Sequence, residues 1–196
     1  MSATLKRRDV VSSLLDKRGD LLVVSGLGST AWDISAAGDS PLSFPMWGAM
    51  GAAAMVGLGI ALAQPKRRVL VITGDGEMLM GLGSLATIGV QQPRNLAIAV
   101  VDNERYGETG MQATHTALGV DIAAVASACG FGKAAVVRTG AELEAARAAL
   151  LGEPGPLLMQ IKVVAEKIPL VLPPRDGGLL KTRFRRALLG AAADAE

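Results

Sequence analysis

The alternation of short apolar runs with helical segments constrains this chain more than any other feature. Predominantly apolar runs recur along its length, at residues 21–25, 69–73, 96–101, 134–137 and 157–164. Strands that are buried on both faces have this pattern, and helices between them cover the faces of a parallel sheet. We therefore predict an α/β fold, with a single doubly wound parallel-sheet domain over residues 1–196.

Helical patterns fill the intervals between these runs. Apolar spacing predicts helices over 5–17, 46–63 and 78–90, and a basic helix over about 179–192. Asp121 is expected to cap an alanine-rich helix, and Thr139 with Glu142 forms a capping box for a helix that runs to Leu151. Residues 46–63 are uncharged and approach the length of a membrane span. We interpret them as a buried helix, because small residues dominate there.

Composition excludes several classes of protein. The net charge is +2, and the basic residues cluster at the two ends of the chain, so we expect no nucleic-acid partner. A single cysteine, Cys129, excludes an internal disulfide and a cysteine-built metal site, and it reads as a buried structural thiol. No secretory signal is recognised at the N-terminus, so we expect a cytoplasmic protein without a membrane partner.

Polar residues follow two neighbouring strands at the points where ligands of such sheets bind. Gly74-Asp75-Gly76 ends the run 69–73 and opens a helix, so backbone N–H groups there can approach a phosphate. Asp75 cannot hold the phosphate itself, but it can hold a divalent cation that bridges to the phosphate. The Asn103 amide and a loop carbonyl can reach the same ion, which gives the all-oxygen ligand set that magnesium prefers.

The spacing from Gly76 to Asn103 resembles the Gly-Asp-Gly to Asn motif of thiamine diphosphate enzymes. The resemblance implies thiamine diphosphate and Mg²⁺ as cofactors. It also implies that Asp75, Asn103 and the carbonyl of Arg105 are the metal ligands. The family often has Asn-Asn where this chain has Asp102-Asn103, and the role of Asp102 is left open.

Two upstream segments resemble the split decarboxylases that act on sulfopyruvate and phosphonopyruvate. Residues 25–34 are similar to their diphosphate loop, which implies that the Ser29 and Thr30 hydroxyls bind the diphosphate. Residues 47–51 are similar to the segment that grips the aminopyrimidine, which implies contacts from the Gly48 carbonyl and from Met50. The alternatives are a plain small-residue turn and a core methionine.

The resemblance extends to the loop at 106–115, which follows the asparagine in the same decarboxylases. It places a further set of residues at the cofactor: Gly74, Gly76, Glu77 and Tyr106. His115, the only histidine, is a candidate proton donor or carboxylate-binding group, and Glu108 with Thr109 is a weaker candidate. A solvated loop histidine is the alternative.

The match covers residues from about 20 to 165 and corresponds to the diphosphate-binding (PP) half of the family, the beta subunit in split enzymes. In the family a glutamate from a pyrimidine-binding (PYR) domain activates the cofactor, and this sequence leaves no room for that domain. Glu77, Glu104 and Glu108 do not substitute convincingly. The resemblance therefore implies a PYR-domain alpha subunit as partner, in a heterotetramer of two alpha and two beta subunits.

The function implied is decarboxylation of a small 2-oxo acid, with activity only in the presence of that partner. Carboligation, as in acetolactate synthase, stays open as an alternative. The beta subunit of a 2-oxo acid:ferredoxin oxidoreductase is disfavoured by the single cysteine. A non-catalytic cofactor-binding subunit also stays open, and a plain nucleotide-binding domain is disfavoured because Gly-x-Gly-x-x-Gly is absent.

Overall fold

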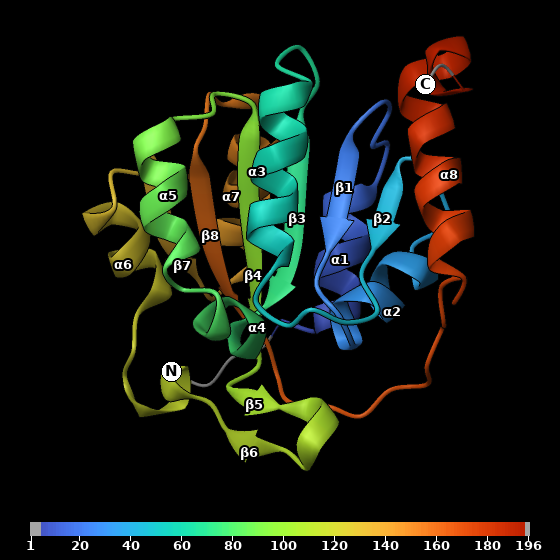
Figure 1. The fold of residues 1–196 in the computed structure, drawn as a ribbon. Coiled ribbons are helices and arrows are strands. Elements are labelled where there is room, and N and C mark those ends of the chain that lie inside the picture. The colour runs from blue at the N-terminus through green and yellow to red at the C-terminus, as the bar shows by residue number, and fades with distance from the viewer. Residues whose placement is uncertain (1–4, 195–196) are drawn as a thin grey trace.

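A six-stranded parallel sheet forms the centre of the computed structural model, which describes residues 5–194 (Figure 1). Its strand order is β2-β1-β3-β4-β8-β7. The strands are β1 (Leu22–Ser25), β2 (Ser43–Pro45), β3 (Val69–Gly74), β4 (Leu96–Asp102), β7 (Lys133–Val137) and β8 (Leu157–Lys162). The predicted α/β fold with a parallel sheet is confirmed.

Helices cover both faces of the sheet. They are α1 (Arg7–Leu15), α2 (Ser29–Ala36), α3 (Ala53–Ala63), α4 (Asp75–Met80), α5 (Ser84–Gln91), α6 (Ile122–Ala128), α7 (Gly140–Gly152) and α8 (Gly177–Leu189). One apolar core joins α1 and α7 to the sheet, and a second joins α3, α5 and α6 to the opposite face (Figure 1). Both cores consist mainly of aliphatic side chains, because only 3% of the residues are aromatic.

The order of the strands creates a switch point between β1 and β3. From β1 the chain moves outward to the edge strand β2, and it then returns to form β3 on the other side of β1. Loops that leave neighbouring strands in opposite directions open a crevice at the carboxyl ends of the strands. The loop after β1 and the start of α4 border this crevice.

Three local features differ from the sequence-based prediction. The helix predicted over 46–63 begins only at Ala53, because Ala49 and Gly51 have φ values of 60° and 94°, which a helix cannot accommodate. The helix predicted over 78–90 is divided into α4 and α5, because the backbone leaves the helical conformation at Gly81, where it packs on the Gly51 carbonyl. Strand β2 was not predicted.

The polar loop predicted over 103–116 has structure of its own. It forms a small antiparallel pair, β5 (Arg105–Tyr106) with β6 (Gln112–Ala113), and two short 3-10 helices. Figure 1 shows this pair below the carboxyl ends of the central strands. The loop therefore lies across the end of the sheet where a ligand is expected.

Both predicted helix caps are confirmed. The Asp121 carboxylate accepts a hydrogen bond from the Ala124 N–H at 2.9 Å, and Thr139 with Glu142 forms the capping box at the start of α7. Helix α8 continues into a 3-10 helix (Gly190–Asp194) and packs on the edge strand β2. None of the described helices has the length and apolar character needed to cross a membrane.

Candidate cofactor-binding site

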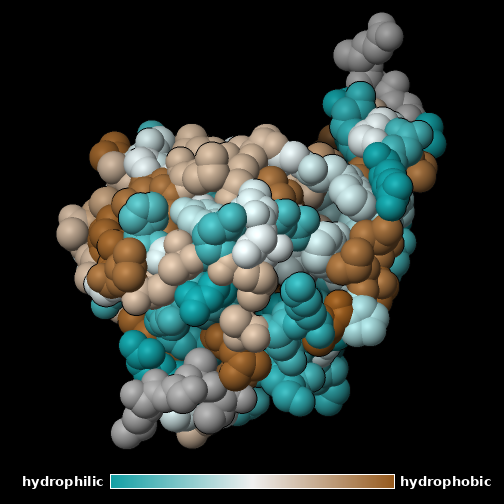
Figure 2. Space-filling model, turned by 90° about the horizontal axis from the view of Figure 1, so that it is seen from below, coloured by the Kyte–Doolittle hydropathy of each residue, from teal (hydrophilic) through white to brown (hydrophobic). Residues whose placement is uncertain are grey.

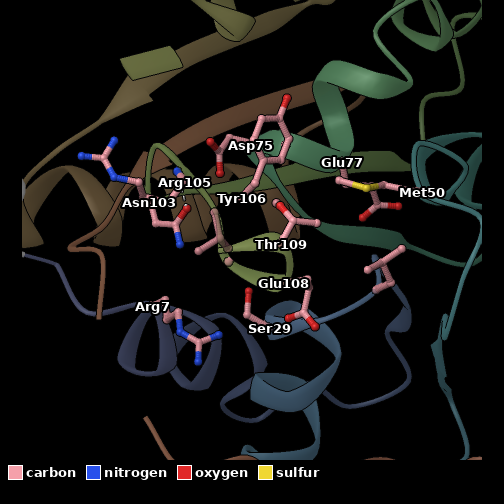
Figure 3. Close-up of a pocket in the computed structure, with 15 residues that line it drawn as sticks. Arg7, Ser29, Met50, Asp75, Glu77, Asn103, Arg105, Tyr106, Glu108 and Thr109 are labelled. Atoms are coloured by element: carbon pink, nitrogen blue, oxygen red, sulfur yellow. Dashed lines mark hydrogen bonds between the residues drawn. The ribbon is translucent and has the colours of Figure 1, made fainter. Parts of the chain in front are cut away.

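A cleft that is partly open to solvent lies at the carboxyl ends of β1, β3 and β4 (Figure 3). Eleven of the residues predicted from the sequence line it: Ser29, Met50, Gly74, Asp75, Gly76, Glu77, Asn103, Arg105, Tyr106, Glu108 and Thr109. Thr30, Gly48 and His115 are not among its lining residues. The fold thus brings the segments that follow β1, β2, β3 and β4 together around one space, as expected at the carboxyl ends of parallel strands.

Asp75 is the first residue of α4 and is only 2% exposed. Its Oδ2 accepts a hydrogen bond from the Thr114 hydroxyl at 2.5 Å, and the Thr116 hydroxyl oxygen lies 3.3 Å from the same atom. Burial and the nearby charge of Asp102 raise the pKa of Asp75 to about 6. A bound cation would stabilise the carboxylate form, and the two threonines orient it.

Asn103 follows β4 directly and lines the same cleft. Its Oδ1 accepts a hydrogen bond from the Arg105 N–H at 2.9 Å, which forms a tight turn. An amide oxygen has a second lone pair, so this bond leaves Asn103 able to accept or coordinate once more.

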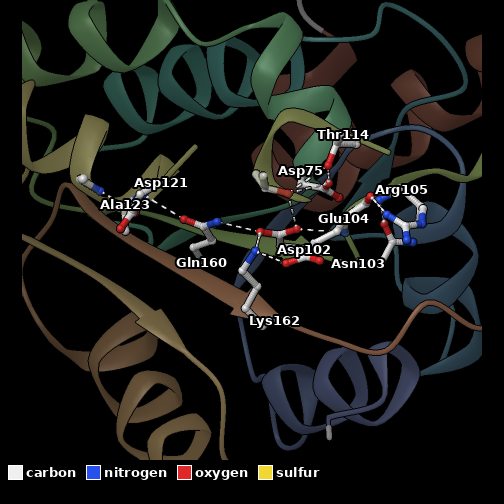
Figure 4. Close-up of polar contacts among 12 residues, drawn as sticks. Asp75, Asp102, Asn103, Glu104, Arg105, Thr114, Asp121, Ala123, Gln160 and Lys162 are labelled. Atoms are coloured by element: carbon white, nitrogen blue, oxygen red, sulfur yellow. Dashed lines mark hydrogen bonds and ion pairs between the residues drawn. The ribbon is translucent and has the colours of Figure 1, made fainter. Parts of the chain in front are cut away.

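Asp102, whose role the sequence left open, is completely buried and does not line the cleft. Figure 4 shows it enclosed by polar groups from several elements. The ammonium of Lys162 lies 2.8 Å from its Oδ2, and the Gln160 amide and the Thr116 hydroxyl donate to it at 2.6 and 2.8 Å. These contacts make Asp102 an internal support of the Asn103 loop.

Gly76 lies between two of the predicted cofactor residues. A Cβ atom at this position would come within 2.6 Å of the Tyr106 ring and within 3.6 Å of the Met50 methyl group. Only glycine lets the Tyr106 ring approach the start of α4 this closely, whereas the distance to Met50 is an ordinary contact. Met50 is 37% exposed, so its side chain is available at the rim of the cleft.

Glu77 is buried and is already engaged with the protein. Its two carboxylate oxygens accept hydrogen bonds from the Thr73 hydroxyl at 2.6 Å and from the Ala53 N–H at 3.4 Å. Burial raises the pKa of this carboxyl. Glu77 therefore ties β3 to the start of α3.

The loop after β1 carries Ser29 at the start of α2, with Gly28 before it at a φ of 71°. Ser29 lines the cleft, whereas the buried Thr30 hydroxyl donates to the Gly26 carbonyl at 3.0 Å. The Glu108 carboxylate approaches Gly28, at 3.0 Å from the position a Cβ atom would take. Ser29 is thus placed to contact a ligand, and Thr30 supports the turn.

His115 begins a 3-10 helix and is exposed outside the cleft. Glu108 and Thr109 line the cleft from the loop over residues 103–116, which lies across the end of the sheet. Figure 3 places Arg7, Ser29 and Glu108 on one side of the cleft and Asp75, Asn103 and Tyr106 on the other. A catalytic role of His115 or Glu108 stays a prediction.

Arg7 and Lys162 are site residues that the sequence did not reveal. Arg7 lines the cleft from α1, 18 residues before the start of the first motif at residue 25 (25 − 7), and in the sequence it belongs to a terminal basic cluster. Lys162 ends the apolar strand β8, where a buried lysine requires an acidic partner. The sequence therefore indicated that Lys162 needs an acidic partner, but it did not show that this partner is Asp102.

The donor set fits a magnesium–diphosphate group. Among the described residues, no three histidine, cysteine, aspartate or glutamate side chains gather as a metal cluster. A cation at Asp75 would therefore depend on neutral oxygens and on phosphate, which suits a hard ion such as Mg²⁺. Gly76 lines this cleft at the start of α4, and Arg7 is a buried cation in the same cleft.

Comparison with known proteins agrees with this geometry. Residues 28–161 match the family model "Thiamine pyrophosphate enzyme, C-terminal TPP binding domain". The solved structure of benzoylformate decarboxylase from Polynucleobacter necessarius superposes with a TM-score of 0.73 at 22% identity, over 85% of this chain and 34% of that one. The chain belongs to the thiamine pyrophosphate enzyme family, and thiamine diphosphate is its cofactor.

Two curated relatives narrow the class. The chain is 35% identical over 190 residues to the "Sulfopyruvate decarboxylase subunit beta" of Methanothermobacter thermautotrophicus, covering 97% of this chain and 99% of the relative. It is 42% identical over 144 residues to the "Phosphonopyruvate decarboxylase" of Streptomyces viridochromogenes, covering 74% of this chain and 36% of the relative. The predicted resemblance and the thiamine diphosphate-dependent decarboxylase class are confirmed.

Proposed function

We propose that this chain, folded as one PP-type domain, is the beta subunit of a thiamine diphosphate- and Mg²⁺-dependent enzyme that decarboxylates a small 2-oxo acid. The observation that carries the proposal is that Asp75 and Asn103 line the same cleft, although 27 residues (76 to 102) lie between them in the sequence. The relatives that bear decarboxylase names support the reaction type.

Asp75, Asn103 and the Arg105 carbonyl are the proposed protein ligands of Mg²⁺. Asp75 provides the charged ligand, and the two neutral oxygens and the cofactor phosphates complete an all-oxygen set. The Ser29 hydroxyl and the backbone around Gly76 hold the diphosphate. On the opposite side, Met50 supports the cofactor's rings from the rim of the cleft, with Gly48 as a backbone acceptor.

The activating glutamate is proposed to come from a partner subunit with a PYR domain. The described carboxylates at the cleft do not suit this role: Glu77 is held by Thr73 and Ala53, and Glu108 lies beside Gly28 at the diphosphate side. Large apolar side chains are also exposed near Met50, notably Trp47 at 40% and Met80 at 63%. In Figure 2, which looks onto this end of the molecule, apolar and polar residues are interspersed. A partner surface would cover these apolar groups.

The proposed substrate is a 2-oxo acid with a second anionic group. The relatives named for sulfopyruvate and phosphonopyruvate act on such acids, and this supports the same class here. When bound, thiamine diphosphate supplies the electron sink for loss of carbon dioxide. His115 and Glu108, on the loop that lies across the end of the sheet, are the candidates to contact the substrate or move a proton.

The test is release of carbon dioxide from a panel of 2-oxo acids, measured with this chain alone and with it co-purified with a PYR-domain partner. We expect turnover only in the complex, loss of turnover when EDTA removes the metal, and the highest kcat/KM with a sulfonate- or phosphonate-bearing acid. Carboligation would appear as a condensed hydroxy-oxo acid in place of the aldehyde. Absence of both products in the magnesium-loaded complex would contradict the proposal.

A further inference from the structure

Arg7 is a buried cation at the cleft, and one nitrogen of its guanidinium group makes no hydrogen bond to the described residues. It is 4% exposed, and it lines both the cleft and an adjoining cavity that includes Trp32 and Glu166. Its Nη1 lies 3.0 Å from Asp33 Oδ2, but the contact lacks hydrogen-bond geometry, and Nη1 makes no hydrogen bond with any residue in the range 5–194. Asp33 Oδ2 likewise makes no hydrogen bond within this range, so charge holds this buried pair together and the hydrogen-bonding capacity of both groups is not fully used.

Arg7 shares its carboxylate partner with a second arginine. Arg8 also contacts Asp33, through a hydrogen bond from Nε to Oδ1 at 3.1 Å. One carboxylate is therefore divided between two guanidinium groups, and Arg7 is also within the electrostatic influence of Glu108 and Glu166. Arg8 is more exposed and does not line the cleft, so Arg7 is the member of this pair that can meet a ligand there.

An anionic group already lies close to this cation. The Glu108 carboxylate occupies the space beside Gly28, on the same side of the cleft as Arg7 and Ser29 (Figure 3). The positive φ of Gly28 and the start of α2 at Ser29 form a turn whose backbone can approach an anion closely. This position is therefore suited to a phosphate group when Glu108 is displaced.

We propose that Arg7 is a direct ligand of the terminal phosphate of thiamine diphosphate, and that this phosphate takes the place of the Glu108 carboxylate. The inference rests on the proposed function of the cleft. Asp75, Glu77 and Glu108 line the same cleft, so a diphosphate entering it requires a cation in addition to the metal. A guanidinium presents two parallel N–H groups to phosphate oxygens, which suits it to this role.

The experiment is calorimetric titration of the wild-type, Arg7→Met and Arg8→Met chains, each in complex with the partner subunit and with Mg²⁺ present. Arg7→Met should weaken thiamine diphosphate binding by about 10- to 100-fold, as expected for a lost charge-assisted hydrogen bond. Inorganic pyrophosphate, used as a competitor, should lose affinity by a similar factor. Arg8→Met is the matched control and should stay within about fivefold of the wild type.

A second variant separates ligand binding from structural pairing. In Arg7→Met/Asp33→Asn the carboxylate that Arg7 neutralises is also removed. Affinity that stays low in the double variant supports direct contact with the phosphate, whereas affinity restored to the wild-type value would overturn the inference. Wild-type affinity in Arg7→Met, or a rise in the KM of the 2-oxo acid alone, would overturn it as well. A wild-type complex that binds no thiamine diphosphate would instead refute the proposed function.

Discussion

Lys162 and Asp102 lie opposite each other on the paired strands β8 and β4, with 2.8 Å between the lysine Nζ and the aspartate Oδ2. Both side chains are buried, at 7% and 0% exposure, and Asp102 immediately precedes Asn103. Asp102 also accepts the Glu104 N–H at 3.0 Å. This ion pair therefore fixes the end of β4 and the turn that presents the proposed metal ligand.

Lys162→Met is expected to destabilise the chain by about 3–5 kcal/mol, because it leaves the Asp102 carboxylate buried without its counter-charge. Lys162→Met/Asp102→Asn should recover more than half of that loss. The measurement is the free energy of unfolding from chemical denaturation. Lys133→Met is the control: Lys133 pairs with Glu153 at 2.8 Å on the surface, and its loss should cost at most about 1 kcal/mol. Equal losses for Lys162→Met and Lys133→Met would contradict the account.

Gly76→Ala should displace the Tyr106 ring and lower the free energy of unfolding by about 1–3 kcal/mol, because the new methyl group overlaps the ring. Tyr106 is the only tyrosine, so the NMR resonances of its ring report the displacement. Gly83→Ala is the control, because a Cβ atom at Gly83 would lie in open space. It should leave both the free energy of unfolding and the position of the Tyr106 ring unchanged. Replacing the ring in Gly76→Ala/Tyr106→Ala should reduce the cost of the methyl group; an unchanged cost would show that Tyr106 is not the obstacle.

Magnesium binding should become weaker as the pH falls through about 6. Burial and the charge of Asp102 raise the pKa of the metal-free Asp75 to about 6, and a cation binds only the carboxylate form. Below that pH the metal must displace a proton, whereas above it the carboxylate is already formed. Calorimetry in two buffers with different ionisation enthalpies measures the proton released. The matched variant Asp75→Asn, which cannot titrate, should release none at this position. An affinity that stays constant from about pH 5 to pH 7 would contradict this assignment.

The sequence predicted those parts of the fold that depend on local patterns. The apolar runs located β3 and β4, and the side chains of Asp121 and Thr139 located two helix starts, because each feature arises within a few residues. The predicted start of α3 was wrong and the break before α5 was not predicted, since both arise where Gly51 and Gly81 pack against each other. That contact joins positions 30 residues apart (81 − 51), which no local pattern records.

The site shows the same division. Asp75 and Asn103 could be placed at one cleft from their positions at strand ends. Arg7 could not, because its approach to the cleft depends on how α1 packs beside α2. The Lys162–Asp102 pair depends on the register of β8 against β4. These two strands are neighbours in the sheet although β7 lies between them in the sequence, so the pairing could not be read from chain order.

The most direct test of the central claim is titration of thiamine diphosphate into this chain, alone and with its partner subunit, in the presence and absence of Mg²⁺. We predict binding that requires Mg²⁺, is tight only with the partner, and is lost in Asp75→Ala while the variant retains its fold by circular dichroism. Absence of binding in every setting, or binding unaffected by both Mg²⁺ removal and Asp75→Ala, would contradict the assignment of this cleft to a magnesium-bound thiamine diphosphate.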